Sequence, residues 1–513
     1  MKKNNIEKVL IANRGEIAVR IIRTLKEMGI RAAAVYSEAD RDSLAVRLAD
    51  EAICIGPAAA WESYLDIEKV IGAAKKLKAD ALHPGYGFLS ENPELARACR
   101  NAGIIFIGPS YDSMKIMGDK VLAKEIAERA GVPILAGSKE KVNDITIARG
   151  MAGAIGYPLI IKAALGGGGR GLRIVRNDLE LENCFYTAQM EARTAFGNDD
   201  LFLEKYVEDA RHIEFQVLGD STGHAIHFPE RECTIQRRHQ KLIEEAPSPF
   251  IDGTMRREMG EAAVAVAEAV GYFSAGTVEF LCDSRRNFYF IEMNTRIQVE
   301  HPVTEAICGI DLIRKQVEIA NGESIDIPQG EITPHGWAIE CRINAEDPMR
   351  DFLPTPGQIG FVHFPSGQGV RVDSHIYSGY TIPRHYDSLI AKVIAHGEDR
   401  LGAIAKMKRA LYELAVEGVC TTAIFHRRVL SDIEFVEGRF STSYIECNWE
   451  RLTTPEMSDA EIGAIAAAIE VYLLTRRSMP QLGIEDILKE RQNLWKLSGR
   501  RQAMEGLPGT GER

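Results

Sequence analysis

Patterns of buried strands and amphipathic helices alternate at the start of the chain. The apolar run at residues 9–12 predicts a buried parallel strand, and residues 32–36 predict the next one. Between them, residues 16–28 predict an amphipathic helix that ends before Gly29. Parallel strands need a crossover between them, so this order predicts a doubly wound α/β sheet. We expect this first domain to cover residues 1–115.

The loop after the first strand, residues 13–16 (Asn-Arg-Gly-Glu), contains one glycine. A dinucleotide-binding fingerprint needs three glycines there, so the loop disfavours a nicotinamide enzyme. A second unit follows, in which Asn92 is the expected N-cap of a helix with Pro93 at its first position. The doubly wound architecture is therefore expected without that cofactor.

The rest of the chain predicts three further segments. Residues 116–334 show strand and hairpin patterns with Gly-rich turns, and we expect a flap subdomain at about residues 133–206. Residues 335–446 predict a mixed α/β domain, and residues 447–513 a helical and basic tail. The fold class is thus a multidomain mixture of α/β and α+β.

Composition narrows the functional classes. The 513 residues are 45% apolar and 26% charged, as in ordinary globular multidomain proteins. A net charge of −11 disfavours nucleic acid and anionic membranes as partners. Nine scattered cysteines predict neither a disulfide framework nor a zinc site. No run approaches the ~20 apolar residues of a membrane helix. We therefore expect a reduced, cytoplasmic enzyme.

Glycines cluster between two strand patterns. Five of six consecutive residues are glycine, namely Gly166, Gly167, Gly168, Gly169 and Gly171. Residues without Cβ atoms let backbone N–H groups approach phosphate oxygens, and Lys162 on the entering strand can add a positive charge. No Gly-Lys-Ser/Thr follows, so this is not a Walker A loop. The pattern predicts a phosphate-binding hairpin flap, and a flexible surface hairpin is the alternative.

Two glutamates interrupt apolar strand patterns. Residues 276–281 and 288–294 predict a β-hairpin whose strands carry Glu279 and Glu292. Burying unpaired carboxylates is costly, so we expect a cation between them. Mg²⁺ is usually held by one or two carboxylates plus phosphate oxygens, which predicts a metal–nucleotide site. The alternative is a pair of glutamates on a solvated face.

The segment after this hairpin is polar at alternate positions. Arg296, Gln298 and Glu300 would project to one side of an extended chain. An arginine, an amide and a carboxylate together suit a site that holds a small oxyanion while a base acts on it. A structural salt-bridge ladder is the alternative. The basic cluster at residues 231–241 is expected to add groups for the nucleotide and a second anion.

These motifs occur in the order found in ATP-grasp enzymes. More narrowly, four segments resemble biotin carboxylase signatures, namely residues 11–16, 83–92, 292–302 and 340–347. The resemblance covers residues 6 to about 446. It implies a central ATP-grasp fold with a mobile glycine-rich flap, and two half-reactions. ATP phosphorylates bicarbonate to carboxyphosphate, which yields CO₂ to N1 of biotin carried on a partner.

The resemblance also implies roles for individual residues. Beside the glycine-rich flap, the nucleotide would be held by Lys120, Lys162, Glu204, Lys205, Val207, His212, Gln236 and His239. Of these, residues 204, 205 and 207 would form the adenine hinge. Mg²⁺ or Mn²⁺ would be bound by Glu279, Glu292 and Asn294. Bicarbonate would be held by Lys241, Arg296, Gln298 and the Val299 backbone, with Glu300 as its base. The enolate oxygen of biotin would be stabilised by Arg342, with Tyr86 nearby.

Biotin is expected to arrive on another chain. Residues 405–408 (Ala-Lys-Met-Lys) superficially resemble a biotin attachment sequence, but they fall in an amphipathic helix pattern. The apolar stripe of that helix is Ile404, Met407, Leu411 and Leu414. The resemblance therefore implies two partners, a biotin carboxyl carrier protein and a carboxyltransferase subunit, together with a homodimer or higher oligomer. Acetyl-CoA, propionyl-CoA or pyruvate would be the final acceptor.

The tail after about residue 450 departs from the family pattern. Ser458 and Glu461 predict a capping box for an Ala-rich helix at residues 459–474. Residues 494–501 faintly resemble small subunits of biotin-dependent acyl-CoA carboxylase and decarboxylase complexes, so we expect the tail to dock a partner subunit. Two alternative functions stay open. One is another ATP-grasp ligase, such as a carbamoyl-phosphate-synthase-like enzyme, and the other is a non-catalytic nucleotide-binding scaffold.

Overall fold

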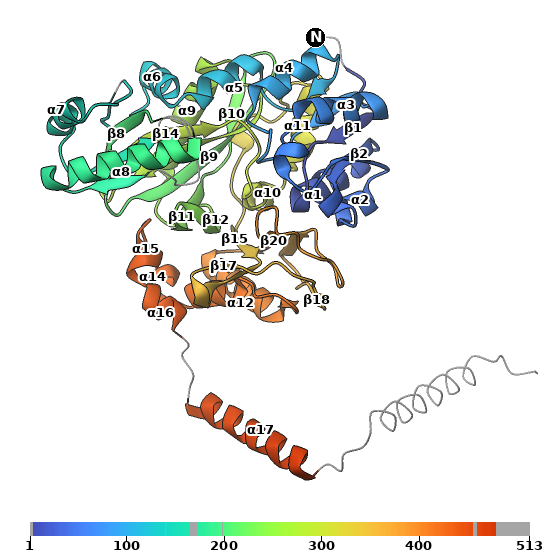
Figure 1. Ribbon diagram of the computed structural model, residues 1–513. Coiled ribbons are helices and arrows are strands. Elements are labelled where there is room, and N and C mark those ends of the chain that lie inside the picture. The colour runs from blue at the N-terminus through green and yellow to red at the C-terminus, as the bar shows by residue number, and fades with distance from the viewer. Residues whose placement is uncertain (1–3, 139, 164–171, 197–198, 455–458, 479–513) are drawn as a thin grey trace, which may run out of the picture. The chain divides into compact units, whose positions relative to one another are not determined.

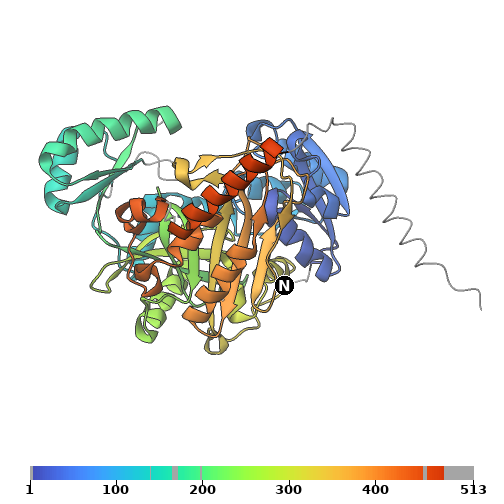
Figure 2. The same ribbon diagram turned by 90° about the horizontal axis from the view of Figure 1, so that it is seen from below.

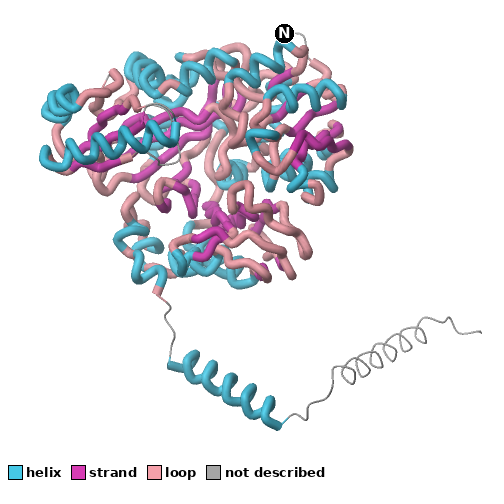
Figure 3. Tube along the Cα trace, viewed as in Figure 1, coloured by secondary structure: helices cyan, strands magenta, loops and turns pink. Residues whose placement is uncertain are grey.

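The computed structural model describes residues 4–138, 140–163, 172–196, 199–454 and 459–478. The chain forms two units, Met1–Thr453 and Thr454–Arg513 (Figure 1). Figure 3 shows several groups of strands in the first unit, with helices beside them. Within the described ranges, no helix is both long enough and apolar enough to cross a membrane.

A parallel five-stranded sheet opens the first unit, in the order β3-β2-β1-β4-β5. Its strands are β1 (Lys8–Ile11), β2 (Arg31–Ser37), β3 (Glu51–Gly56), β4 (Ala81–His83) and β5 (Ile105–Phe106). The accompanying helices are α1 (Gly15–Glu27), α2 (Leu44–Leu48), α3 (Ile67–Leu77), α4 (Pro93–Asn101) and α5 (Tyr111–Gly118). Asn92 caps α4, because its side chain accepts a 2.9 Å hydrogen bond from the backbone N–H of Glu94. The predicted doubly wound sheet is confirmed.

A small antiparallel sheet carries the predicted flap hairpin. Its order is β7-β6-β8, with β6 (Leu159–Ala163), β7 (Arg173–Val175) and β8 (Leu201–Lys205). Helices α7 (Ile145–Ile155) and α8 (Asp178–Phe196) pack on it, and Figure 2 shows this teal and green subdomain projecting from one side of the unit. The flanking strands of the hairpin are confirmed. The predicted phosphate-binding glycines lie outside the described residues, namely Gly166, Gly167, Gly168, Gly169 and Gly171.

The largest sheet has nine strands and carries several of the candidate site residues. Eight strands follow the order β14-β13-β9-β11-β12-β15-β20-β19, and β10 pairs with β9. Their bounds are β9 (Arg211–Gly219), β10 (Ala225–His227), β11 (Arg231–Arg237), β12 (Gln240–Ala246), β13 (Ser274–Cys282), β14 (Phe288–Asn294), β15 (Trp337–Asn344), β19 (Val370–Ser374) and β20 (Leu389–Gly397). Strands β13 and β14 form the predicted hairpin. Because β12 pairs with β15, one sheet runs through the central and C-terminal segments.

Helices surround this sheet on the central and C-terminal sides. They are α6 (Lys120–Arg129), α9 (Gly253–Ala269), α10 (His301–Cys308), α11 (Leu312–Ala320), α12 (Arg400–Glu413), α13 (Ala423–Val429), α14 (Ile433–Val436), α15 (Tyr444–Cys447) and α16 (Trp449–Thr453). Short strand pairs lie at its C-terminal end, namely β16 (Glu346–Asp347) with β17 (Leu353–Pro354) and β18 (Val362–His363) with β21 (Ala415–Val416).

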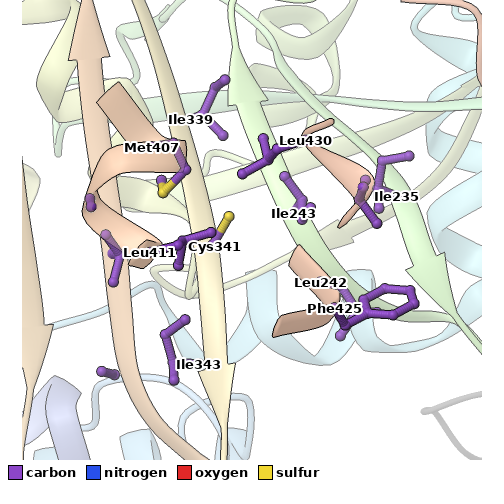
Figure 4. Packing of buried hydrophobic residues seen from close by; sticks show 14 of the residues in the cluster. Ile235, Leu242, Ile243, Ile339, Cys341, Ile343, Met407, Leu411, Phe425 and Leu430 are labelled. Atoms are coloured by element: carbon purple, nitrogen blue, oxygen red, sulfur yellow. The ribbon is translucent and has the colours of Figure 1, made fainter. Parts of the chain in front are cut away.

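The two faces of β15 separate a hydrophobic core from the polar side of the sheet. Ile339, Cys341 and Ile343 alternate along the strand and belong to one buried cluster with Met407 of α12 (Figure 4). Residues between them, such as Arg342, therefore point to the opposite face. Met407 is fully buried inside a helix, so the sequence around it does not form the turn that biotin attachment requires.

The second unit contains α17 (Asp459–Ser478), which confirms the predicted tail helix. Ser458 lies outside the described residues, and the side chain of Glu461 is likewise not described, so the capping box stays a prediction. Three apolar side chains at helical spacing are exposed on α17, namely Ile465 (51%), Ile469 (53%) and Tyr472 (61%).

Candidate active site

One cleft in the first unit gathers nearly all of the predicted site residues that the structure describes. Its volume is about 1470 Å³. The predicted residues that line it are Tyr86, Lys120, Lys162, Lys205, Val207, His212, Gln236, His239, Lys241, Glu279, Glu292, Asn294, Arg296, Gln298, Val299, Glu300 and Arg342. Glu204 does not line the cleft directly but is paired with Lys162, which does. The sequence therefore identified groups from several distant segments that the fold brings together.

Lys241 is the centre of a buried charge cluster. Its Nζ lies 2.5 Å from Glu214 Oε2, 3.0 Å from Glu279 Oε1 and 2.7 Å from Glu300 Oε1. Burial lowers the pKa of Lys241, but the three carboxylates outweigh this effect and hold the pKa well above its usual range. The ammonium group therefore stays charged in the cleft, where it can also meet an anionic substrate.

Glu300 lies between two cations. Besides its contact with Lys241, its Oε2 accepts a 2.9 Å hydrogen bond from Arg342 Nη2. Burial raises the pKa of Glu300, yet Lys241 and Arg342 prevail and hold it well below its usual range. Glu300 is thus an ionised carboxylate that can accept a proton from a group held between these cations.

The predicted extended chain at residues 296–300 is wrong at its end. Val299 and Glu300 form a turn, and Glu300 has φ −82° and ψ 9° as the residue that precedes α10. Pro302 in the first turn of α10 favours a helix start here. The side chains of Arg296, Gln298 and Glu300 nevertheless line the same cleft, because the turn redirects the last one.

Arg296 and Gln298 connect this segment to the hairpin. Arg296 donates a 2.9 Å hydrogen bond to Asn294 Oδ1 and pairs at 3.0 Å with Glu91 Oε2. Gln298 donates a 2.7 Å hydrogen bond to Glu279 Oε1. An arginine and an amide thus lie beside the carboxylates, as an oxyanion site requires.

Glu279 and Glu292 face each other across the β13–β14 hairpin, in direct register. Burial raises the pKa of Glu292, and the neighbouring Glu279 raises it further. A carboxylate whose charge is destabilised by a second carboxylate beside it fits a site for a divalent cation. Both oxygens of Glu279 already have protein partners, since Oε1 accepts from Lys241, Asn294 and Gln298 and Oε2 lies 2.8 Å from His212. Metal binding would exchange at least one of these contacts.

The other two suggested metal ligands differ in their arrangement. Asn294 turns its amide nitrogen toward Glu279 and its oxygen toward Arg296, so its role as a metal ligand stays a prediction. Ligand atoms of His212, Glu214 and Glu279 all lie within 4.8 Å of one another, close enough to hold a metal ion. Sequence reasoning did not suggest this second set, which shares Glu279 with the first.

A second ion cluster lies at the flap side of the cleft. Glu204 Oε2 is 2.5 Å from Lys162 Nζ, and its other oxygen pairs with Lys124. Burial raises the pKa of Glu204, but the two lysines outweigh it and lower the pKa to about 2. The Lys205 side chain turns away to donate a 2.7 Å bond to the Tyr157 carbonyl. If residues 204–207 form the adenine hinge, they would therefore bind adenine through backbone groups.

Sequence analysis did not single out the carboxylates that hold the predicted residues in place, and it gave Arg231 only as part of an anion-binding cluster. Arg231 and Glu214 are both fully buried and pair at 2.5 Å. Glu244 lies 2.5 Å from Arg342 Nε. Glu214 stands in a largely apolar strand pattern, the same signal that singled out Glu279. That signal could have found Glu214, whereas no local pattern shows which cation each carboxylate meets.

Three family models match consecutive segments of the chain. They describe the N-terminal domain of biotin carboxylase at residues 5–114, the ATP-binding domain of the carbamoyl-phosphate synthase L chain at residues 119–327, and the C-terminal domain of biotin carboxylase at residues 340–447. Biotin carboxylase 1 of Bacillus subtilis is 53% identical over 442 residues, which cover 86% of this chain and 98% of that protein. The chain belongs to the biotin carboxylase family.

Other members of the biotin carboxylase family agree with this assignment. A pyruvate carboxylase subunit of Methanothermobacter thermautotrophicus is 48% identical over 488 residues, which cover 92% of this chain and 99% of that protein. A crystal structure of a Campylobacter jejuni biotin carboxylase complex with β,γ-ATP matches with a TM-score of 0.84 and 49% identity, and covers 86% of this chain and 99% of that one.

A third structure is informative about ligands. The biotin carboxylase domain dimer of Hydrogenobacter thermophilus 2-oxoglutarate carboxylase was solved with MgADP, ADP and bicarbonate. It matches with a TM-score of 0.85 and 47% identity, and covers 88% of this chain and 99% of that one. The predicted family, the ATP-grasp fold of the central segment and the enzyme class are therefore confirmed.

Proposed function

We propose that this protein is the biotin carboxylase subunit of a biotin-dependent carboxylase. It uses ATP and bicarbonate to carboxylate biotin carried on a separate biotin carboxyl carrier protein. The observation that carries the proposal is the position of Glu300, which lies between Lys241 and Arg342 in one cleft with the facing Glu279 and Glu292. The ATP, magnesium and bicarbonate ligands of the solved relatives support it.

The nucleotide would occupy the flap side of the cleft. Its phosphates and ribose would be held by Lys120, Lys162, His212, Gln236 and His239, and its adenine by the backbone at residues 204–207. Lysines act here as point charges on phosphate oxygens. Glu279 and Glu292 would hold Mg²⁺ or Mn²⁺, which when bound neutralises charge on those oxygens.

Bicarbonate would lie against the cations on the other side. Lys241, Arg296, Gln298 and the Val299 backbone would hold it, and Glu300 would take its proton. The deprotonated oxygen then attacks the terminal phosphorus of ATP, and ADP leaves. Glu300 by itself is a weak base, because its pKa is held low. The same cations stabilise the carbonate dianion as it forms, which favours proton transfer.

Carboxyphosphate would then break down to CO₂ and phosphate beside biotin. The phosphate would take the proton from N1 of biotin, and N1 would form the new bond to CO₂. Arg342 would stabilise the negative charge that develops on the ureido oxygen of biotin, and Tyr86 lines the same cleft. A closed flap would exclude water, which would otherwise hydrolyse carboxyphosphate.

The partners follow from the chemistry and from the relatives. The helical setting of Met407 agrees with biotin on a separate carrier protein, and a carboxyltransferase subunit would pass the carboxyl group to acetyl-CoA, propionyl-CoA or pyruvate. The dimer of the Hydrogenobacter relative supports a homodimer or a higher oligomer. We also propose a reducing compartment such as the cytoplasm, because all nine cysteines are free thiols.

The tail is proposed to dock another subunit of this complex. Ile465, Ile469 and Tyr472 lie at helical spacing on α17 and are exposed, as are Val471, Leu473 and Leu474, so this helix presents apolar surface that a partner would cover. The match to the Methanothermobacter pyruvate carboxylase subunit covers 92% of this chain, whereas the match to the Bacillus biotin carboxylase covers 86%. This larger share supports a role for the tail in a complex of subunits.

The proposal is tested by measuring ADP release with and without bicarbonate and free biotin. We expect release that depends on bicarbonate and increases with biotin. ADP release that does not change when biotin is added would favour another ATP-grasp ligase. ATP binding without any turnover would favour a nucleotide-binding scaffold.

A further inference from the structure

Lys392 of β20 is a fully buried lysine that sequence reasoning did not single out. Its Nζ donates a 2.7 Å hydrogen bond to the carbonyl oxygen of Val299. The same ammonium group lies 3.1 Å from Glu16 Oε1. Val299 is the residue before the proposed base, Glu300, so a buried charge holds the turn that presents this base to the cleft.

Glu16 connects Lys392 to Tyr86, a residue that lines the cleft. Glu16 of α1 is 3% exposed, and it accepts a hydrogen bond from the hydroxyl of Tyr86. A continuous chain of contacts therefore runs from Tyr86 through Glu16 and Lys392 to Val299. It joins the N-terminal sheet, the C-terminal part of the large sheet and the turn before α10.

The sheet register explains why Lys392 reaches this place. Lys392 is the direct partner of Arg342 on β15 and of Asp373 on β19. Directly paired residues point to the same face of a sheet, so Lys392 shares the face of Arg342. This is the face opposite the apolar cluster of Figure 4. Lys392 is thus fixed beside the arginine proposed to act on biotin.

Stability alone does not account for a lysine here. Replacing a buried ion pair with apolar groups of similar volume is often neutral or stabilising, so a buried pair is weak evidence for a purely structural role. Lys392 also holds the Val299 carbonyl next to Glu300, so it can orient the proposed base in addition to pairing with Glu16.

We propose that Lys392 is a positioning residue for the carboxylation reaction. It fixes the Val299 carbonyl, and with it the orientation of Glu300, and it couples this turn through Glu16 to Tyr86. The inference rests on the proposed function and adds a residue to it. Lys392 contacts neither substrate, because it does not line the cleft.

The test separates positioning from charge compensation. Lys392→Met leaves Glu16 as an uncompensated buried carboxylate, so this variant is compared with the double variant Lys392→Met, Glu16→Gln. In the double variant position 16 carries no charge, and the introduced glutamine retains an acceptor for Tyr86. The bond to Val299 is still lost. Each protein is assayed for thermal unfolding, MgATP affinity, and kcat and KM for bicarbonate in ADP release.

We expect the double variant to regain thermal stability relative to the single variant and to bind MgATP within about twofold of wild type. Its kcat/KM for bicarbonate should still fall about 10- to 100-fold, the equivalent of one hydrogen bond to a charged group. Wild-type kinetics in the double variant would overturn the inference, because Lys392 would then only compensate the charge of Glu16.

A second variant decides the case if the double variant does not fold. Lys392→Arg retains the charge for Glu16 but moves the donor relative to the Val299 carbonyl. A raised KM for bicarbonate with unchanged MgATP affinity supports positioning, and unchanged kinetics overturn it. Failure of the proposed function is distinguishable, since wild-type protein would then show no bicarbonate-dependent ADP release at all.

Discussion

Replacement of Glu300 by glutamine tests the proposed base directly. The side chain keeps its shape, but its amide nitrogen is a donor. Only one of the two contacts, at 2.7 Å from Lys241 and 2.9 Å from Arg342, can therefore keep its hydrogen bond. Neither cation becomes unpaired, because Lys241 retains Glu214 and Arg342 retains Glu244. We therefore expect the free energy of unfolding to fall by about 1–3 kcal/mol, as for hydrogen bonds to charged groups.

The effect on turnover should be much larger than the effect on stability. A positioned general base contributes about 10²–10⁴-fold, so bicarbonate-dependent ADP release should fall by that factor in Glu300→Gln. ATP affinity, measured by calorimetry, should stay within about threefold. Wild-type turnover in a folded Glu300→Gln protein would remove Glu300 from the role of base.

The chain offers a matched control in Glu245→Gln. Glu245 and Glu300 are both 2% exposed, and Glu245 is also held by an arginine, Arg400, at 2.7 and 3.0 Å. Glu245 does not line the cleft. The control should lose comparable stability and retain its turnover. Equal losses of turnover in both variants would show that any buried glutamate change disturbs the site.

Three further outcomes are expected. Lys162 and Lys124 lower the pKa of Glu204 from 4.5 to about 2. This carboxylate should therefore add about 3 kcal/mol to the free energy of unfolding above pH 4.5, and this contribution should disappear as the pH falls through 2. The pH dependence of unfolding, compared between wild type and Glu204→Gln, measures the contribution. Glu292→Gln should weaken ATP binding in the presence of Mg²⁺ but not in EDTA, as calorimetry can show. Deletion of residues 455–513 should leave bicarbonate-dependent ADP release intact and abolish association with the partner subunits, measured by co-purification. Undiminished association would refute docking by the tail.

The elements of the site were predictable because their signals are local. The apolar strand patterns at residues 276–281 and 288–294 predicted the hairpin, and the cap at Asn92 predicted the start of α4. Charged residues in apolar strand patterns marked Glu279 and Glu292. The resemblance to a family then assigned roles that no pattern of spacing shows.

The turn at Glu300 was not predictable from alternation. Residues 296–300 follow a strand-like pattern, but Pro302 favours the start of a helix, and the turn before that helix sets the direction of the Glu300 side chain. Likewise, no local signal shows that Lys241 meets Glu214, Glu279 and Glu300 at once.

The sequence by itself determined which segments become strands and helices, which residue types line the cleft, and the family. Tertiary structure alone decided which charges meet. Lys241 and Glu300 are 59 positions apart, and Lys392 and Val299 are 93 apart. Contacts of this length depend on the order and register of strands in the large sheet. That order is set by packing of the whole unit and not by neighbours along the chain.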